Sequence, residues 1–254
     1  MNKVEERILE HLNFLVEKHQ IPENKILGIF LYGSQNYGCS HLNSDIDTKA
    51  VYIPDLAESI VGKPKIHTYI LENGEHCELI DIRSYISNLY KQNMNFVETL
   101  FTDFYYLSPK YKELWEKYFV ENRERIAYYD MSKGIQSMIG QTLHTLDQNP
   151  TNGKKVGNAY RMMWSLNNYF KMEPYSEVIR LDKNKRREIR SFKEKEYIDP
   201  AYAKIIKQTL ARNKEIYLKN VKKINMIERV DIEETLTKAV VECVLTCEGI
   251  YGKK

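Results

Sequence analysis

The stretch Leu31–Lys49 reads LYGSQNYGCSHLNSDIDTK and is flanked by apolar runs on both sides. It holds a Gly-Ser pair, Gly33 and Ser34, and after ten intervening residues an Asp-x-Asp pair, Asp45 and Asp47. Two carboxylates so close together repel each other unless a positive partner compensates, and a divalent metal is the strongest candidate. Mg²⁺ is typically held by one or two carboxylates plus the phosphates of a substrate. The Gly-Ser turn suits a phosphate, because glycine lets the backbone approach a ligand and the Ser hydroxyl and nearby N–H groups can bind it.

Apolar runs on both sides place this stretch between two buried strands. Residues 25–32 precede the Gly-Ser pair, and residues 45–53 run through the carboxylates into a second apolar stretch. Runs of this length between turn residues predict strands. Side chains two residues apart share a face, so we expect Asp45 and Asp47 to project side by side. Lys49 follows on that face, where it could balance their charge or touch a phosphate. An isolated Asp-x-Asp is more often a solvated turn, so the strand context is what favours a site.

A hairpin is predicted further along the chain. The β-rich runs 66–71 and 75–80 flank an Asn-Gly pair, which is a strong hairpin signal. The second run puts Glu78 on one face of its strand. Asp81 then precedes a helical pattern over residues 82–93 and is well placed to cap that helix.

The pattern Gly33-Ser34-x10-Asp45-x-Asp47 resembles the signature of the DNA polymerase β-like nucleotidyltransferase superfamily. YGSQNYG followed by NSDIDTKAVYIP is similar to predicted nucleotidyltransferases of bacteria and phages, including the YcgL-type proteins. The resemblance is strongest over residues 26–108. It implies an α+β fold with a small mixed or antiparallel sheet and flanking helices. It also implies transfer of a nucleoside monophosphate from an NTP, with Mg²⁺ or Mn²⁺, and a role for Gly33 and Ser34 in gripping the β- and γ-phosphates.

The resemblance further implies a centre of three carboxylates. Asp45 and Asp47 would hold both metal ions, and an acidic residue flanked by apolar ones on a neighbouring strand would complete the site. Residues 77–80, CELI, have this form, with Glu78 in place of the commoner Asp. Asp81 is the alternative, although a helix cap explains it more simply.

The segment KQNMNFVETLFTD, residues 91–103, also resembles this branch. An Asn and a Glu in a similar arrangement are matched here by Asn93 or Asn95 and by Glu98. We expect Glu98 either to be buried and to cap backbone groups or to lie near the active site.

The second half of the chain is predicted to be helical. An amphipathic helix over residues 3–19 and the strands above would form a catalytic domain, 1–108, and a helical domain would cover 109–254. Within the latter, Lys154 and Arg161 stand seven residues apart on one helix face. Related proteins often carry a Lys, a His and an Arg at this kind of spacing, and here Asn158 stands where His is common. The two cations would meet a triphosphate or an acceptor's phosphate; a solvated helix face is an equal alternative.

A basic run, KNKRREIRSFKEKE, follows at residues 183–196. Such a run is usually a solvated face. It could also contact a polynucleotide backbone, because neutralising phosphates needs clustered Lys and Arg side chains. It is not accompanied by a known RNA-binding motif.

The composition is that of a globular protein. The 254 residues are 43% hydrophobic, with a net charge of only +3. The sequence has no apolar run long enough for a bilayer, and its charged N-terminus is unlike a signal peptide, so we expect a cytoplasmic protein without a membrane partner. The four cysteines lack CxxC spacing and are expected to be reduced thiols.

The acceptor is not determined by these patterns. It could be an RNA 3′ end, which the basic run favours slightly, a protein hydroxyl or a small molecule. A non-enzymatic alternative is an inactive nucleotide-binding or antitoxin-like protein, against which the intact carboxylates argue. A metal-dependent phosphohydrolase is less favoured, because His41, His67 and His76 lack the spacing of metal ligands. Of these, His76 is a weak candidate because it shares a strand face with Glu78.

Overall fold

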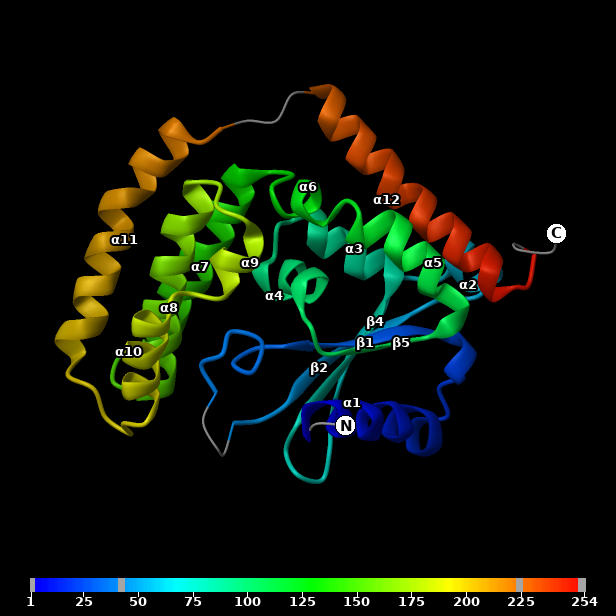
Figure 1. The fold of residues 1–254 in the computed structure, drawn as a ribbon, viewed down its shortest axis with the longest axis horizontal. Coiled ribbons are helices and arrows are strands. Elements are labelled where there is room, and N and C mark those ends of the chain that lie inside the picture. The colour runs from blue at the N-terminus through cyan, green and yellow to red at the C-terminus, as the bar shows by residue number, and fades with distance from the viewer. Residues whose placement is uncertain (1–2, 41–43, 223–225, 251–254) are drawn as a thin grey trace.

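The computed structural model describes residues 3–40, 44–222 and 226–250, and a five-stranded sheet lies at its centre (Figure 1). The strands lie in the order β3-β4-β2-β1-β5. Their bounds are β1 Ile26–Tyr32, β2 Asp47–Tyr52, β3 Ile66–Ile70, β4 His76–Asp81 and β5 Tyr105–Leu107. β2 is parallel to β4, and the other neighbouring pairs are antiparallel, so the sheet is mixed. The predicted α+β class, with a mixed sheet, flanking helices and a helical second half, is confirmed.

The helices follow the predicted pattern closely. Their bounds are α1 Lys3–Asn13, α2 Leu56–Val61, α3 Ile82–Tyr90, α4 Met94–Val97, α5 Lys112–Trp115, α6 Arg123–Ala127, α7 Met131–Gln148, α8 Gly153–Phe170, α9 Tyr175–Ile179, α10 Lys183–Lys193, α11 Pro200–Asn220 and α12 Met226–Cys247. Single π-helical turns extend α1 over Phe14–Lys18 and α5 over Glu116–Val120. In the three described ranges, no helix is long and apolar enough to serve as a membrane span.

The sheet is covered on both faces, as its continuous apolar strands require. α1 packs Ile8 and Leu12 against one face, where they meet Ile29 and Leu31 of β1. α3 and α5 pack on the other face, and α12 lies against these two helices (Figure 1). Phe30 of β1 points to that side. His11 of α1 is fully buried, with Nδ1 2.7 Å from the Thr48 hydroxyl of β2.

Two details of the sheet differ from the prediction. β2 begins at Asp47, so Asp45 precedes the strand instead of belonging to it. β5 was not predicted; its three residues form the edge of the sheet by pairing with residues 28–30 of β1. The Asn-Gly hairpin between β3 and β4 is confirmed, and Gly74 there has a φ of +84°.

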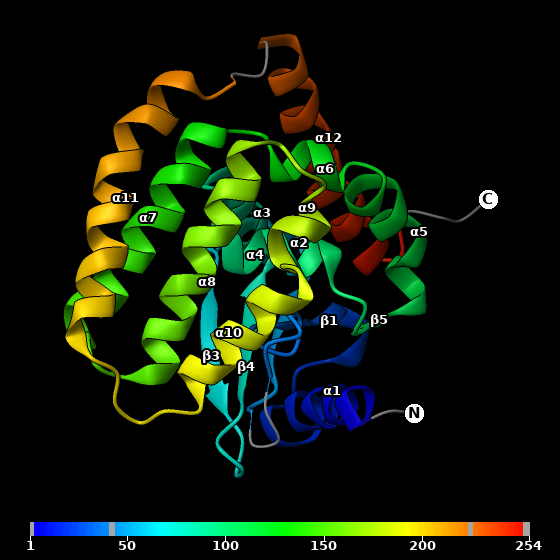
Figure 2. The same ribbon diagram turned by 60° about the vertical axis from the view of Figure 1, so that its left-hand side comes forward.

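Side-chain caps and one close approach position the helices around the site. Asn152 accepts a hydrogen bond from the Lys155 N–H and starts α8, and Asp182 starts α10 in the same way. α10 then packs along α8 (Figure 2). A Cβ on Gly153 would lie 1.9 Å from the Lys195 carbonyl oxygen, so only glycine allows the end of α10 to meet the start of α8.

The larger of the two buried clusters crosses residue 108. Phe30 of β1 stacks on Trp115 of α5 at a ring distance of 4.4 Å, and both belong to a cluster that extends to Val244 of α12. The division into domains 1–108 and 109–254 therefore stays a prediction, and a shared core lies across it.

Candidate functional site

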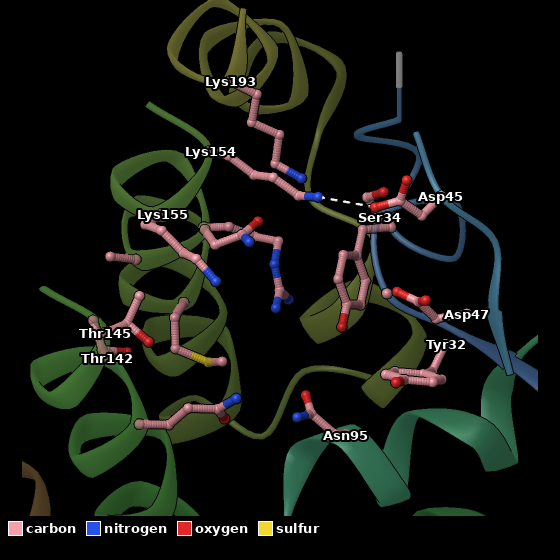
Figure 3. Close-up of a pocket in the computed structure, with 17 residues that line it drawn as sticks. Tyr32, Ser34, Asp45, Asp47, Asn95, Thr142, Thr145, Lys154, Lys155 and Lys193 are labelled. Carbon is pink, nitrogen blue, oxygen red and sulfur yellow. Dashed lines mark hydrogen bonds and ion pairs between the residues drawn. The ribbon is translucent and has the colours of Figure 1, made fainter. Parts of the chain in front are cut away.

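A cavity of about 330 Å³ opens between the β1–β2 end of the sheet and helices α7, α8 and α10 (Figure 3). The strands and the loops beside them contribute its acidic wall, and the helices contribute its basic wall. The predicted residues that line it are Gly33, Ser34, Asp45, Asp47, Lys154 and Arg161. Residues distant in sequence thus meet around one space.

The acidic wall is built by the opening residues of β2. Asp47 pairs in register with Tyr32, the last residue of β1, and Asp45 precedes it by two. Both carboxylates line the cavity, although Asp45 does so from the chain before the strand. Gly33 follows β1 directly with a φ of +89°, a conformation that favours glycine, and turns the chain toward Ser34.

The basic wall faces these carboxylates (Figure 3). α8 supplies Lys154, Lys155 and Arg161, and α10 supplies Lys193 from its last turn. Lys154 and Arg161 therefore share one helix face, as their spacing predicts, and Asn158 lies between them at the cavity. The ammonium of Lys154 reaches across to Asp45 at 3.1 Å.

Arg161 is the least satisfied group of this wall. Its side chain is buried, and its guanidinium lies 3.6 Å from the centre of the Tyr37 ring. Nε and Nη1 have no hydrogen-bond partner. Buried polar groups are normally hydrogen-bonded, so these two nitrogens are donors available to a water or to a ligand oxygen in the cavity.

The environment of Lys193 also favours an anion in the cavity. Its burial, together with the positive charges of Arg161 and Lys154, lowers its pKa to about 8. A wall of crowded cations with an unpartnered guanidinium would be stabilised by an anion in the cavity.

Glu98 supports the Gly-Ser turn from behind. It is fully buried, as predicted, and accepts a hydrogen bond from the Gly33 N–H at 3.2 Å. Burial raises the pKa of Glu98 to about 7, although the nearby charge of Arg161 opposes the rise. The other carboxylate oxygen, Oε2, has no hydrogen-bond partner. Because Glu98 engages the Gly33 N–H, the turn offers Ser34 to a phosphate more directly than it offers Gly33.

Glu78 and Lys49 form a pair of their own. The parallel register of β2 and β4 sets them directly opposite each other, and their side chains form an ion pair. Lys49 is only 3% exposed, and its ammonium lies 4.2 Å from the centre of the Tyr32 ring. Neither residue lines the cavity. Lys49 thus balances the carboxylate of Glu78, and its predicted role beside Asp45 and Asp47 or at a phosphate stays a prediction.

Asp81, the alternative third carboxylate, lies at the far end of β4. It caps α3 by accepting a hydrogen bond from the Arg83 N–H, which confirms the cap prediction. Its carboxylate also forms an ion pair with the Arg83 guanidinium at 2.6 Å.

The carboxylates that could hold a metal are therefore Asp45 and Asp47. Within the described ranges, no group of three or more His, Cys, Asp and Glu side chains converges as a metal site. Asp47 accepts a hydrogen bond from the His76 backbone N–H at 3.2 Å, and the His76 ring lies equally near. Two carboxylates fit Mg²⁺ when substrate phosphates complete its shell. Glu78 and Asp81 as metal ligands stay predictions, and His41 lies outside the described residues.

Several cavity residues were not singled out from the sequence. Tyr37 and Lys193 lie next to Arg161, and Gln141 and Thr145 line the cavity from α7. Lys193 lay within the basic run noted in the sequence. Tyr37, Gln141 and Thr145 had no signal, because each is an ordinary polar or aromatic residue until the fold places it. Of the two Asn residues considered in the sequence, Asn95 lines the cavity from α4 and Asn93 caps that helix.

Comparison with known proteins does not identify a family for this chain. No family model matches the chain, and no curated protein matches it. Among solved structures, it is similar to a nucleotidyltransferase-like protein from Exiguobacterium sibiricum 255-15, with a TM-score of 0.32 and 11% sequence identity. That alignment covers 95% of this chain and 78% of the other. At this distance the other protein's function does not transfer to this chain.

Proposed function

We propose that this protein is a metal-dependent nucleotidyltransferase, which moves a nucleoside monophosphate from an NTP to a hydroxyl acceptor. The observation that carries the proposal is the two-walled cavity, with Asp45 and Asp47 on one side and four cations on the other. A triphosphate with a bound divalent ion needs both kinds of wall. The sequence pattern around the Gly-Ser turn and the two carboxylates supports the same reading.

The basic and the acidic residues of the cavity have different roles. Arg161 and Lys193 bind phosphate oxygens from the basic wall, which gives the guanidinium its missing partners. Ser34 contacts phosphate from the turn beside β1. Asp45 and Asp47 would hold Mg²⁺ or Mn²⁺. When bound, such an ion supplies charge neutralisation at the triphosphate and lowers the pKa of the attacking hydroxyl.

The transfer itself is an in-line displacement. The acceptor oxygen forms a bond to the α-phosphorus, and the bond from that phosphorus to the oxygen bridging the β-phosphate breaks. Pyrophosphate leaves with the electron pair of that bond, held by Arg161 and Lys193, and the hydroxyl proton passes to Asp47 or to water. Holding the charges in place before reaction is the main contribution of the protein.

Label transfer tests the proposal. The protein is incubated with Mg²⁺ or Mn²⁺, each α-labelled NTP, and total cellular RNA and protein. We expect label on an acceptor, with a loss of about 100-fold or more in Asp45→Asn and Asp47→Asn. Asp147→Asn, which changes an exposed carboxylate on α7, is the matched control and should retain transfer. Equal transfer by Asp47→Asn and the wild type would contradict the proposal.

One observation favours a second candidate, a nucleotide-binding protein that does not transfer. Glu78 is neutralised by Lys49 and does not line the cavity, whereas Asp45 and Asp47 do. The basic wall predicts NTP binding in either case. Binding of an NTP without transfer to any acceptor, under both metals, would favour this candidate over the enzyme.

A further inference from the structure

The positive charge of this chain is concentrated on one helix. α10, Lys183–Lys193, carries six basic residues and one acidic residue, a net charge of +5 within 11 residues. The whole chain carries only +3, so the remaining residues are net acidic. A solvated helix face usually mixes both signs in similar numbers, whereas on α10 six basic residues accompany one acidic residue.

Four of these cations line one groove. This groove has a volume of about 400 Å³ and is lined by Lys183, Arg186, Arg187 and Arg190. The four residues recur at the spacing of a single helix face. None of the four forms an ion pair with a carboxylate anywhere in the described ranges of the chain. The buried Nε of Arg186 also has no hydrogen-bond partner. The groove thus has cations but no protein anion to match them.

The groove lies next to the cavity of the candidate site, because both lie along α10 and the groove's arginines contact the loop after Ser34. Arg190 donates a hydrogen bond to the Gly38 carbonyl at 2.6 Å, in the loop that follows Gly33 and Ser34. The guanidinium of Arg186 lies against Gly38 as well. One turn beyond Arg190, Lys193 lines the catalytic cavity itself. The cations therefore form a track about 15 Å long on one helix, ending at the proposed reaction site.

We propose that this track binds the sugar–phosphate backbone of a single-stranded polynucleotide, whose terminal hydroxyl enters the catalytic cavity. The role of that end as acceptor rests on the proposed function, but the binding of the strand does not. Successive phosphates match a row of unpaired cations, whereas a mononucleotide would occupy only one end of it. Contacts of this kind are independent of base sequence and sensitive to salt.

Fluorescence anisotropy with labelled oligouridylate and oligothymidylate of about 15 nucleotides, without NTP, tests the track. The double variant Lys183→Glu/Arg187→Glu reverses two exposed cations outside the catalytic cavity. We expect its affinity to fall at least tenfold, and the slope of log K against log salt to fall by about 1.4, for two lost phosphate contacts. Lys204→Glu/Arg212→Glu, the same charge change at exposed positions on α11, is the matched control and should bind like the wild type.

The outcomes separate the track from the chemistry. Equal loss in the α10 and α11 variants, or no loss in either, overturns the track. Competition by a mononucleotide or a blunt duplex as strong as that of the oligonucleotide overturns the single-strand assignment. Strand binding by the wild type without any transfer would count against the proposed function alone. Circular dichroism melting shows whether each variant is folded.

Discussion

Arg161 is where binding and stability conflict most directly. A buried guanidinium with two unpartnered nitrogens costs folding free energy that only a ligand recovers. We therefore expect Arg161→Met to lower NTP affinity at least tenfold and to raise the free energy of unfolding of the unliganded protein by about 1 kcal/mol. Calorimetric titration and urea unfolding measure the two effects. Lys171→Met, at an exposed lysine just after α8, is the control. Unchanged NTP affinity in Arg161→Met would remove this residue from the phosphate site.

Glu98 makes stability depend on pH. Its pKa is about 7 in the folded protein and 4.5 in an unperturbed carboxyl, because burial disfavours the charge. Between these values the folded protein holds a proton that the unfolded chain has released, so the free energy of unfolding falls as pH rises through this window. We expect Glu98→Gln to remove a fall of about 2–3 kcal/mol. Urea unfolding at pH 4.5 and 8 measures it, with the exposed Glu196→Gln as control. The same pH slope in Glu98→Gln and the wild type would contradict the expectation.

Individual site residues were predictable where a short spacing determines them. Asp45 and Asp47 follow from a local motif, and Lys154 and Arg161 follow from helical periodicity. Tyr37 does not, because the ring under the Arg161 guanidinium comes from a loop more than a hundred residues earlier in the chain.

At the scale of elements, the Lys49–Glu78 pair joins β2 to β4. We expect Lys49→Met to lower the free energy of unfolding by about 1–3 kcal/mol, because it leaves the carboxylate of Glu78 without its cation. The double variant Lys49→Met/Glu78→Gln should recover most of the loss, as a coupled pair does. Urea unfolding of the cycle measures this. Additive losses would contradict the coupling.

The same cycle tests the predicted third metal ligand. If the Glu78 carboxylate only stabilises the pairing of β2 with β4, the Mg²⁺ concentration for half-maximal label transfer should be unchanged in the double variant. A rise of tenfold or more would instead assign Glu78 to the metal.

Most strands could be predicted from the sequence, but which strands pair with each other in the sheet could not. β1 and the β3–β4 hairpin follow from apolar runs and the Asn-Gly turn. β4 follows the hairpin turn in the chain, yet it pairs in parallel with β2, the strand that begins at Asp47. No local sequence signal determines this pairing or its register. β5 has three residues and no alternation to detect, since its pairing with β1 alone makes it a strand.

At the scale of the whole molecule, the cavity exists only because the two halves of the chain meet. The sheet supplies Asp45 and Asp47, and α8 and α10 supply the cations. The change from mixed to helical periodicity near residue 108 is real, but periodicity reports local structure and not where a core is divided. The packing of Phe30 on Trp115 shows one core across the change.

The shared core leads to a prediction about fragments. Residues 1–108 alone would expose the face of β1 that Phe30 presents to Trp115, and would lose the hydrogen bond from the Tyr111 hydroxyl to the Asn24 carbonyl at 2.8 Å. We therefore expect fragment 1–108 to show no cooperative thermal transition by circular dichroism, whereas the full chain unfolds in one. Co-expression of 1–108 with 109–254 is the control, and the pair should copurify and regain the transition. A cooperative transition in isolated 1–108 would show instead that the predicted catalytic domain folds independently, because its own apolar surface would then suffice for a core.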